Sequence, residues 1–333
     1  MRKQNTDGFI LVAVLWIIAA LATLATIFSI YVINTATAFT VHDERLQAEG
    51  CARAAIELAV YQLTANPQGA QATQAAQPAQ PAQAPQAAQA PQPPQAAPAA
   101  QGAPTRGRFV FRIGNAQVTT DFNSETARID LNAAPKELLA GLFTALGAGS
   151  DAAQGYADRI IAWRSPPLAG ATDNEASVYR AAGLIYAPRG NQFPHTAELG
   201  LVLGIPEVMV ERALPFLTIY SGRPQINILD AAPQVIAALP GMEPARLQAV
   251  LAARDAAPQD TQALVASLGA AQALATTQGN KSVRVTAHIA FDSGQRMTTE
   301  AVIFLTDNGA EPYRILTWRD DIDDAQTDAR ATR

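Results

Sequence analysis

The sequence predicts an α+β fold in which a long N-terminal helix packs against an antiparallel sheet, with a helical domain inserted into that sheet. Three observations lead to this prediction. Residues 9–33 are an uncharged apolar run, residues 108–131 and 281–319 alternate apolar and polar side chains, and helix-start motifs fill residues 132–280. Strands repeat every two residues and helices about every 3.6, which separates the two kinds of stretch.

The apolar run 9–33 is 25 residues long. A helix rises about 1.5 Å per residue and the hydrocarbon core of a bilayer is about 30 Å thick, so this run can span a membrane. Arg2 and Lys3 precede it, which favours a cytoplasmic N-terminus. The rest of the chain is then expected outside the cytoplasm, in the periplasm of a Gram-negative cell.

Three interpretations of the run remain open. A cleaved secretory signal could use Ala36-Thr37-Ala38 as its cut site, but its apolar core would be only about 7–15 residues long. A plain signal anchor fits the length. The third interpretation rests on the short polar leader 1–8, which ends in Gly8 directly before Phe9. Membrane insertion does not require this pair, whereas a peptidase that cuts on the cytoplasmic side does.

Residues 34–64 are predicted to continue the helix, because apolar residues recur at near-helical spacing and the first proline after the run is Pro67. The expected stripe comprises Phe39, Leu46, Ile56, Leu58 and Leu63. One helix from Phe9 to about residue 64 would be about 84 Å long. Its second half could pack on its own domain, bundle with other subunits, or do both.

Two segments are expected to lack regular structure. Residues 65–107 contain a tract of Ala, Gln and Pro with no large apolar side chains, so burial cannot offset the loss of chain entropy. The acidic tail, residues 320–333, is expected to be frayed.

The strand regions are predicted from alternation and turns. Gly114-Asn115 reads as the turn of a hairpin that begins at Arg108, and a third strand is expected over residues 126–131. Residues 282–319 predict a three-stranded meander. The first and last strands are expected to meet in one sheet.

A repeated motif organises residues 132–280. Asn132-Ala133-Ala134-Pro135 recurs as Asp230-Ala231-Ala232-Pro233, an offset of 98 residues. A polar N-cap and a proline in the first turn predict a helix start in each copy. We therefore expect an all-α domain with two helix-hairpin-helix-like (SAM-like) repeats.

Such repeats also occur in DNA-binding proteins, so a membrane-anchored DNA-binding protein is the rival hypothesis. In that module a helix N-terminus holds a phosphate. After Leu239-Pro240-Gly241, however, Arg246 is the only nearby cation, and the chain has a net charge of −5. Nucleic acid is therefore not expected as a partner.

No catalytic constellation is evident in the sequence. Its three histidines, His42, His195 and His288, are scattered, and Cys51 is the only cysteine. Histidines without a partner are poor catalytic candidates, and one cysteine excludes spacing-based zinc and redox motifs. We expect neither enzymatic activity nor an organic cofactor.

The leader resembles that of type IV prepilins. This resemblance implies cleavage between Gly8 and Phe9 and N-methylation of Phe9. Family members mostly carry Glu at the fifth mature position, where it is thought to pair with the amine of the neighbouring subunit nearer the tip. Here that position is Ala13. In lacking Glu at this position, the chain resembles the K-type minor pseudopilins of type II secretion systems.

The order of motifs in the helical domain also resembles that family. These motifs are Ala162-Trp163, Glu175, Tyr179, Pro188-Arg189-Gly190-Asn191, Glu198-Leu199 and Leu203-Gly204-Ile205. The resemblance implies a pilin-like fold and a subunit that caps the tip of the pseudopilus, initiates its assembly and supports export across the outer membrane. Implied partners are the I- and J-type minor pseudopilins, the major pseudopilin, the inner-membrane assembly platform, the prepilin peptidase and exported substrates. A minor pilin of a type IV pilus shares the leader but would not explain the inserted repeats.

The resemblance also implies calcium binding, but the residues depart from the family here. The family's Asp-rich stretch is replaced by Arg164-Ser165-Pro166-Pro167. Calcium takes about six to eight oxygens, often from several carboxylates, and only Asp173 and Glu175 are candidates. We expect calcium binding to be weak or absent.

Overall fold

The computed structural model describes residues 7–65, 104–166, 174–307 and 311–320. The leader except its last two residues, most of the expected Ala/Gln/Pro loop, Asp173 and nearly all of the acidic tail lie outside these ranges. Predictions for those segments are therefore not addressed by the structure.

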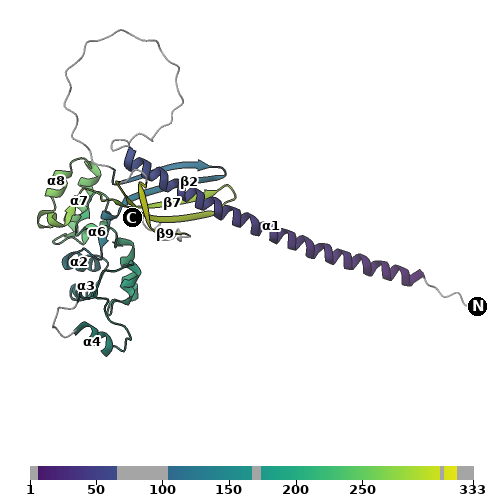
Figure 1. The fold of residues 1–333 in the computed structure, drawn as a ribbon, viewed down its shortest axis with the longest axis horizontal. Helices are drawn as coiled ribbons and strands as arrows, with labels where there is room; N and C mark the ends of the chain where they lie inside the picture. The colour runs from purple at the N-terminus through teal and green to yellow at the C-terminus, as the bar shows by residue number, and fades with distance from the viewer. Residues whose placement is uncertain (1–6, 66–103, 167–173, 308–310, 321–333) are drawn as a thin grey trace, which may run out of the picture.

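One helix, α1 (Asp7–Ala65), forms the N-terminal part of the described chain. Figure 1 shows it projecting far beyond the rest of the molecule. Within it, Val12–Val32 is long and apolar enough to cross a membrane, with a mean hydropathy of 2.3 and none of it buried. The abundance of Ala and the absence of Pro explain why the helix is unbroken.

Five antiparallel strands form the sheet in the order β1-β2-β7-β8-β9. They are β1 (Arg106–Ile113), β2 (Ala116–Ser124), β7 (Ser282–Phe291), β8 (Arg296–Leu305) and β9 (Tyr313–Arg319). β1 and β2 are joined by the expected two-residue turn, in which Gly114 has a φ of 58°. The predicted combination of an N-terminal apolar helix and an antiparallel sheet is confirmed.

The second half of α1 packs on β2, β7 and β8 (Figure 1). Its buried face repeats at helical spacing and is built mainly from small residues: Ala48, Cys51, Ala52, Ala55, Ile56, Ala59, Val60 and Leu63. The small side chains let the helix backbone approach the sheet. The expected stripe does not face the sheet as one set: Ile56 and Leu63 are buried against it, whereas Leu46 and Leu58 lie on the exposed side.

The expected third strand of the sheet is also wrong. After β2 the chain forms a short 3-10 helix, η1 (Glu125–Ala127), and then β3 (Ile129–Asp130). The Ser124 side chain accepts a hydrogen bond from the backbone of Thr126 and starts this turn. β3 then pairs in parallel with β4 (Leu217–Thr218), a partner too distant in sequence to be recognised from local alternation.

The helical region, residues 132–280, lies between β2 and β7 in the chain. Its helices are α2 (Lys136–Ala145), α3 (Ser150–Arg164), α4 (Asn174–Ala181), α5 (Glu207–Ala213), α6 (Pro233–Ala237), α7 (Pro244–Ala256) and α8 (Thr261–Ala266), with 3-10 turns η2 (Thr196–Leu201), η3 (Leu214–Phe216) and η4 (Gly269–Leu274). The region is not purely helical. Besides β4, it contains β5 (Ile226–Asn227), which pairs in parallel with β6 (Ala275–Thr276).

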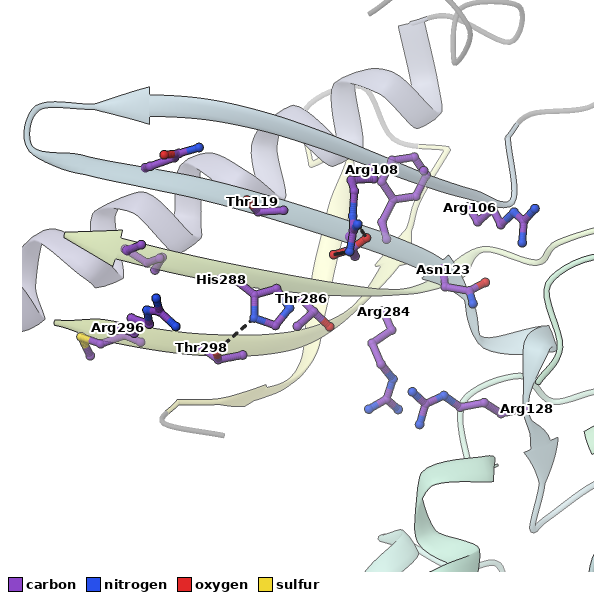
Figure 2. Close-up of a pocket in the computed structure, with 17 residues that line it drawn as sticks. Arg106, Arg108, Thr119, Asn123, Arg128, Arg284, Thr286, His288, Arg296 and Thr298 are labelled. Atoms are coloured by element: carbon purple, nitrogen blue, oxygen red, sulfur yellow. Dashed lines mark hydrogen bonds and ion pairs between the residues drawn. The ribbon is translucent and has the colours of Figure 1, made fainter. Parts of the chain in front are cut away.

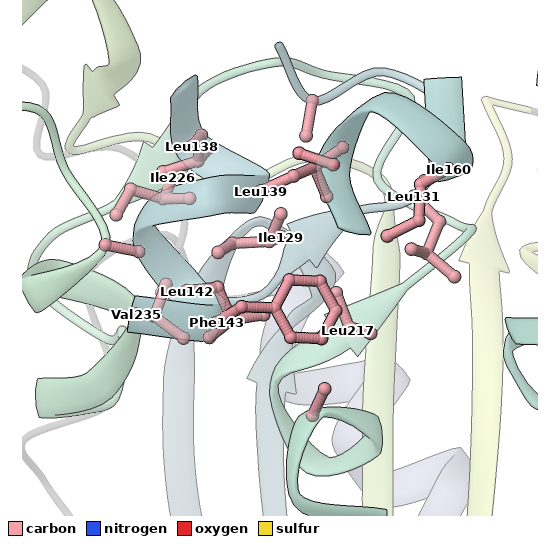
Figure 3. Packing of buried hydrophobic residues seen from close by; sticks show 14 of the residues in the cluster. Ile129, Leu131, Leu138, Leu139, Leu142, Phe143, Ile160, Leu217, Ile226 and Val235 are labelled. Carbon is pink, nitrogen blue, oxygen red and sulfur yellow. The ribbon is translucent and has the colours of Figure 1, made fainter. Parts of the chain in front are cut away.

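One buried apolar cluster runs through the helical region, from Ile129 to Ala271 (Figure 3). Leu138, Leu139 and Phe143 of α2 lie in it, all fully buried. Gly141 lets α2 and α6 approach closely, since a Cβ there would lie 2.0 Å from the carbonyl oxygen of Ala238. The core therefore joins the two motif-bearing segments into one body.

Candidate functional site

The two repeated motifs lie at corresponding turns, each ahead of a helix. Pro135 caps α2 and Pro233 is the first residue of α6, so the predicted helix starts are present. The predicted N-cap roles of Asn132 and Asp230 are wrong. Asn132 instead bonds both backbone groups of Phe193, accepting from N at 2.7 Å and donating to O at 3.0 Å.

Asp230 is buried and takes part in a different contact. Its Oδ2 accepts from the Asn227 side chain at 2.8 Å, and Arg106 Nε lies 3.4 Å from its Oδ1. Burial raises the pKa of the Asp230 carboxyl, and the cations of Arg106 and Arg254 only partly oppose that effect. This residue links the start of β1 to the second motif.

Each motif is also held by an arginine from the last turn of a following helix. Arg164 of α3 donates to the carbonyls of Leu131 and Ala134, the latter at 2.7 Å. Arg254 of α7 donates to the carbonyl of Ala231 at 2.8 Å. Both arginines satisfy turn carbonyls that would otherwise lose hydrogen bonds on burial.

The calcium candidate Glu175 is occupied by a cation of the chain itself. Its Oε2 lies 2.6 Å from Arg159 Nη1. The nearby carboxylate of Glu198 accepts from Trp163 Nε1 at 3.0 Å and pairs with Arg189 at 2.6 Å. Among the described residues, no group of three or more His, Cys, Asp or Glu side chains could hold a metal.

A buried ionic network joins the sheet to the helical region. Glu125 of η1 is fully buried and pairs with Arg284 of β7, with Oε1 to Nε at 2.7 Å. Arg284 also bonds Glu300 of β8, and Thr218 of β4 donates to Glu125. Burial alone would raise the pKa of Glu125, but Arg284 and Arg128 beside it hold that pKa below its usual value.

This network was not foreseen from the sequence. Glu125 follows a strand and reads locally as a turn residue, while its partner Arg284 lies 159 positions later. The one sequence signal was the alternation in β7, which places Arg284 on the face opposite Val283 and Val285 but does not identify its partner.

The face of the sheet turned away from α1 is hollowed into a groove of about 970 Å³ (Figure 2). Polar side chains of β1, β2, β7 and β8 line it because they alternate with those that face α1. Its charged lining comprises Asp121 and five arginines: Arg106, Arg108, Arg128, Arg284 and Arg296. His288, whose Nδ1 lies 3.1 Å from Thr298 Oγ1, is at its centre (Figure 2).

The groove's arginines differ in how their donors are used. Arg284 is 12% exposed and directs its nitrogens at Glu125 and Glu300. Arg108 gives two donors to Asp121, at 2.6 and 3.0 Å, yet its side chain remains 68% exposed. Arg296 is exposed and makes no hydrogen bond or ion pair within the described part of the chain. The groove therefore has basic groups with unused donors.

The processing residues predicted from the leader lie at the start of α1. Gly8 and Phe9 belong to its first turn, and Ala13 lies one turn further on. Cleavage and methylation are not tested by this geometry and stay predictions.

An exposed apolar span leading into a helix packed on an antiparallel sheet defines a membrane-anchored protein of pilin-like fold. Residues 118–222 match the family model described as "Type II secretion system (T2SS), protein K". That match covers β2 to the segment after β4, about a third of the chain, and confirms the resemblance to K-type minor pseudopilins of type II secretion.

The chain is also similar to a chain in the crystal structure of the GspK-GspI-GspJ complex from the type 2 secretion system of enterotoxigenic Escherichia coli. The identity is 16% and the TM-score 0.48, over 64% of this chain and 83% of the other. A comparison with curated proteins found no significant match.

Proposed function

We propose that this protein is a minor pseudopilin that caps the tip of a type II secretion pseudopilus. In this proposal it initiates assembly together with I- and J-type minor pseudopilins and so supports export across the outer membrane. It is anchored by a single pass in the inner membrane, with the N-terminus in the cytoplasm and the bulk in the periplasm. The proposal rests on the family match together with the form of α1.

The form of α1 is the observation that carries the proposal. Its apolar span is unburied, and beyond the span it still exposes large side chains on the side away from the sheet: Leu46 is 58% exposed and Tyr61 65%. Apolar groups left exposed along one helix face favour packing against other helices. This supports assembly through α1, with the sheet and helical region as the extruded head.

Two features support a place at the tip rather than in the shaft. Ala13 replaces the Glu that, by the resemblance, would pair with a subunit above. A carboxylate inside the membrane is costly without a partner, so a subunit with nothing above it has reason to lack one. The helical region also makes the head bulky at the end away from the span (Figure 1).

The assembly proposal is tested by isolating the full chain from membranes that also contain I- and J-type minor pseudopilins. We expect the three to co-purify, and Leu46→Glu or Tyr61→Glu to reduce recovery of the partners. Ile185→Glu, at a fully exposed position of the helical region, is the matched control. Equal recovery from all three variants would contradict assembly through this face of α1.

The tip placement has its own test. Ala13→Glu should lower secretion and partner recovery, because the new carboxylate would lack a neighbouring amine. Unchanged secretion would contradict the placement at the tip of the pseudopilus, but it would not affect the family match.

We also infer that the two motif-bearing units are helix-hairpin-helix-like repeats used structurally, and that the protein neither catalyses a reaction nor binds nucleic acid. Their turn carbonyls are occupied by Arg164 and Arg254, which leaves these cations committed within the chain. A gel-shift assay at low salt with the full chain should detect no DNA complex. A salt-sensitive complex would favour the DNA-binding alternative.

A further inference from the structure

We propose that the groove on the outer face of the sheet is a docking site for an acidic segment of another protein, bound as an extended chain whose carboxylates bridge two opposite corners of the groove. The groove is lined by five arginines and one aspartate, in a chain with a net charge of −5. The partner is defined by its chemistry, as a stretch of polypeptide with Asp or Glu side chains about 20 Å apart. This binding role does not depend on the secretion function proposed above.

The charge of the groove is the first argument. The buried carboxylates of Glu125 and Glu300 neutralise Arg284, so this arginine is structural. Five arginines against Asp121 and these two glutamates leave the groove with a net charge of +2. Because the chain as a whole is acidic, this face attracts anionic partners that the rest of the surface repels.

One corner of the groove holds Arg106 and Arg108, at successive outward-facing positions of β1. Arg106 is exposed, and Arg254 also balances the buried carboxylate of Asp230 beside it. A guanidinium has five N–H donors, and Arg108 uses only one on Nε and one on Nη2 to bond Asp121. Planar guanidinium donors suit carboxylates, so this corner can bind a further one.

The opposite corner holds Arg296, the first residue of β8. It is exposed, and within the part of the chain that the structure describes it forms no hydrogen bond or ion pair. All its donors are therefore available to a second carboxylate of the same segment.

The register of the strands sets the distance between the two corners. Arg108 of β1 and Arg296 of β8 are separated by three strand spacings, about 14 Å, and by four residues along the strands, about 13 Å. Six extended residues cover the resulting diagonal of about 20 Å. Thr119 and His288, which are paired on β2 and β7, lie between the corners, so the floor of the path is polar (Figure 2). A short extended segment therefore fits the groove from corner to corner.

The test uses a nine-residue peptide with two aspartates at each end, uncharged residues between them, blocked termini and an uncharged fluorophore. Its affinity for the full chain in an uncharged detergent is measured by fluorescence anisotropy. We expect Arg296→Glu to weaken binding about tenfold, and added salt to weaken binding to the wild type. Arg212→Glu, exposed on α5 and outside the groove, makes the same change in net charge and should alter the affinity less than about twofold. Equal affinities of these two variants would overturn the proposal.

Asp121→Asn gives a test of opposite sign. It releases Arg108 from its carboxylate partner within the chain, so the peptide should bind about threefold more tightly. An isomer of the peptide with all four aspartates in the middle should bind about fivefold more weakly, because it cannot reach both corners. A loss of affinity in Asp121→Asn, equal binding of the two isomers, or equal binding of a peptide with asparagine in place of aspartate would each contradict the proposal.

Other anionic occupants would produce different results. Heparin that binds more tightly than the peptide, and that is weakened by Arg296→Glu but not by Arg212→Glu, would assign the groove to an anionic polysaccharide. Inorganic phosphate that displaces the peptide at an equal concentration would show that the groove takes single anions. Either result would overturn docking of an acidic protein segment, and neither would affect the secretion role.

Discussion

α1 rests on the sheet through two small apolar clusters, whereas the helical region packs around one continuous core. On α1 half of the buried side chains are alanines, and the large apolar side chains on its other side stay exposed. In the helical region Leu, Ile and Phe fill the interior (Figure 3). The packing of α1 on the sheet therefore leaves one face of the helix available to other molecules, whereas the core of the helical region is closed on itself.

The two bodies meet through polar rather than apolar contacts. Glu125 and Arg284 form the centre of this joint, with Thr218 reaching it from the helical region. Buried charges tolerate little displacement, because each depends on its partner in a medium of low dielectric constant. The joint therefore fixes the direction in which the helical region projects from the sheet.

Breaking this joint should have the largest effect. Arg284→Met leaves Glu125 and Glu300 buried without their cation and should lower stability by about 3–5 kcal/mol. Thermal melts of the full chain in detergent measure this. Arg296→Met, on the neighbouring strand and exposed, is the control and should change stability by less than about 0.5 kcal/mol. Equal melting temperatures for wild type and Arg284→Met would show that the joint does not stabilise the fold.

The stability difference between wild type and Arg284→Met should depend on pH, because the folded-state pKa of Glu125 is lowered. A carboxyl with a lowered folded-state pKa stabilises the fold above its ordinary value of 4.5, and this contribution is lost as the pH falls through the folded pKa. The gap between wild type and Arg284→Met should therefore narrow in acid. A gap that widens below pH 4.5 would contradict the assignment.

Packing within the helical region can be tested at two glycines. Gly141→Ala places a Cβ against the backbone of Ala238 and should cost about 1–3 kcal/mol. Gly155→Ala on α3 meets nothing within 4 Å and should stabilise the chain by up to about 1 kcal/mol through helix propensity. Urea titrations of both variants measure the change in the free energy of unfolding, which should be a loss for Gly141→Ala and a gain for Gly155→Ala. Similar effects at both positions would mean that α2 and α6 are not in close contact.

A smaller effect is expected where α1 meets β9. The Tyr313 hydroxyl donates to Glu57 at 2.7 Å. Burial and this carboxylate raise the pKa of Tyr313 to about 12. A raised pKa means that the protonated phenol stabilises the fold below its ordinary value of 10, and that the contribution is lost as the pH rises through about 12.

Tyr313→Phe should therefore cost about 1 kcal/mol at neutral pH and nothing above pH 12. Alkaline melts of the two proteins measure the difference. Tyr61→Phe, at an exposed position on the other side of α1, should match wild type throughout. A pH-independent deficit in Tyr313→Phe would point to lost packing instead of the hydroxyl contact.

The smallest effect concerns calcium. Because Glu175 is paired with Arg159, calorimetric titration of the full chain should give no binding in the micromolar range. Glu175→Ala removes only a partly exposed ion pair and should change stability by less than about 1 kcal/mol. Micromolar affinity that is lost in Glu175→Ala would overturn our expectation for this site.

The elements predicted best from the sequence are those specified by patterns within a short stretch of the chain. α1 follows from an unbroken apolar and alanine-rich run, and the β1–β2 hairpin from Gly114-Asn115 between alternating stretches. β3 was placed in the wrong sheet because its partner, β4, lies far along the chain. The groove was equally out of reach. Its arginines read as an ordinary solvated strand face until β1, β2, β7 and β8 are placed side by side.

The N-terminus of the mature chain tests the central proposal most directly. Mass spectrometry of the protein isolated from membranes should find a chain that begins at methylated Phe9, and Gly8→Leu should retain the leader and block secretion. A wild-type chain that keeps its leader, or one cut after Ala38, would contradict a role as a pseudopilin.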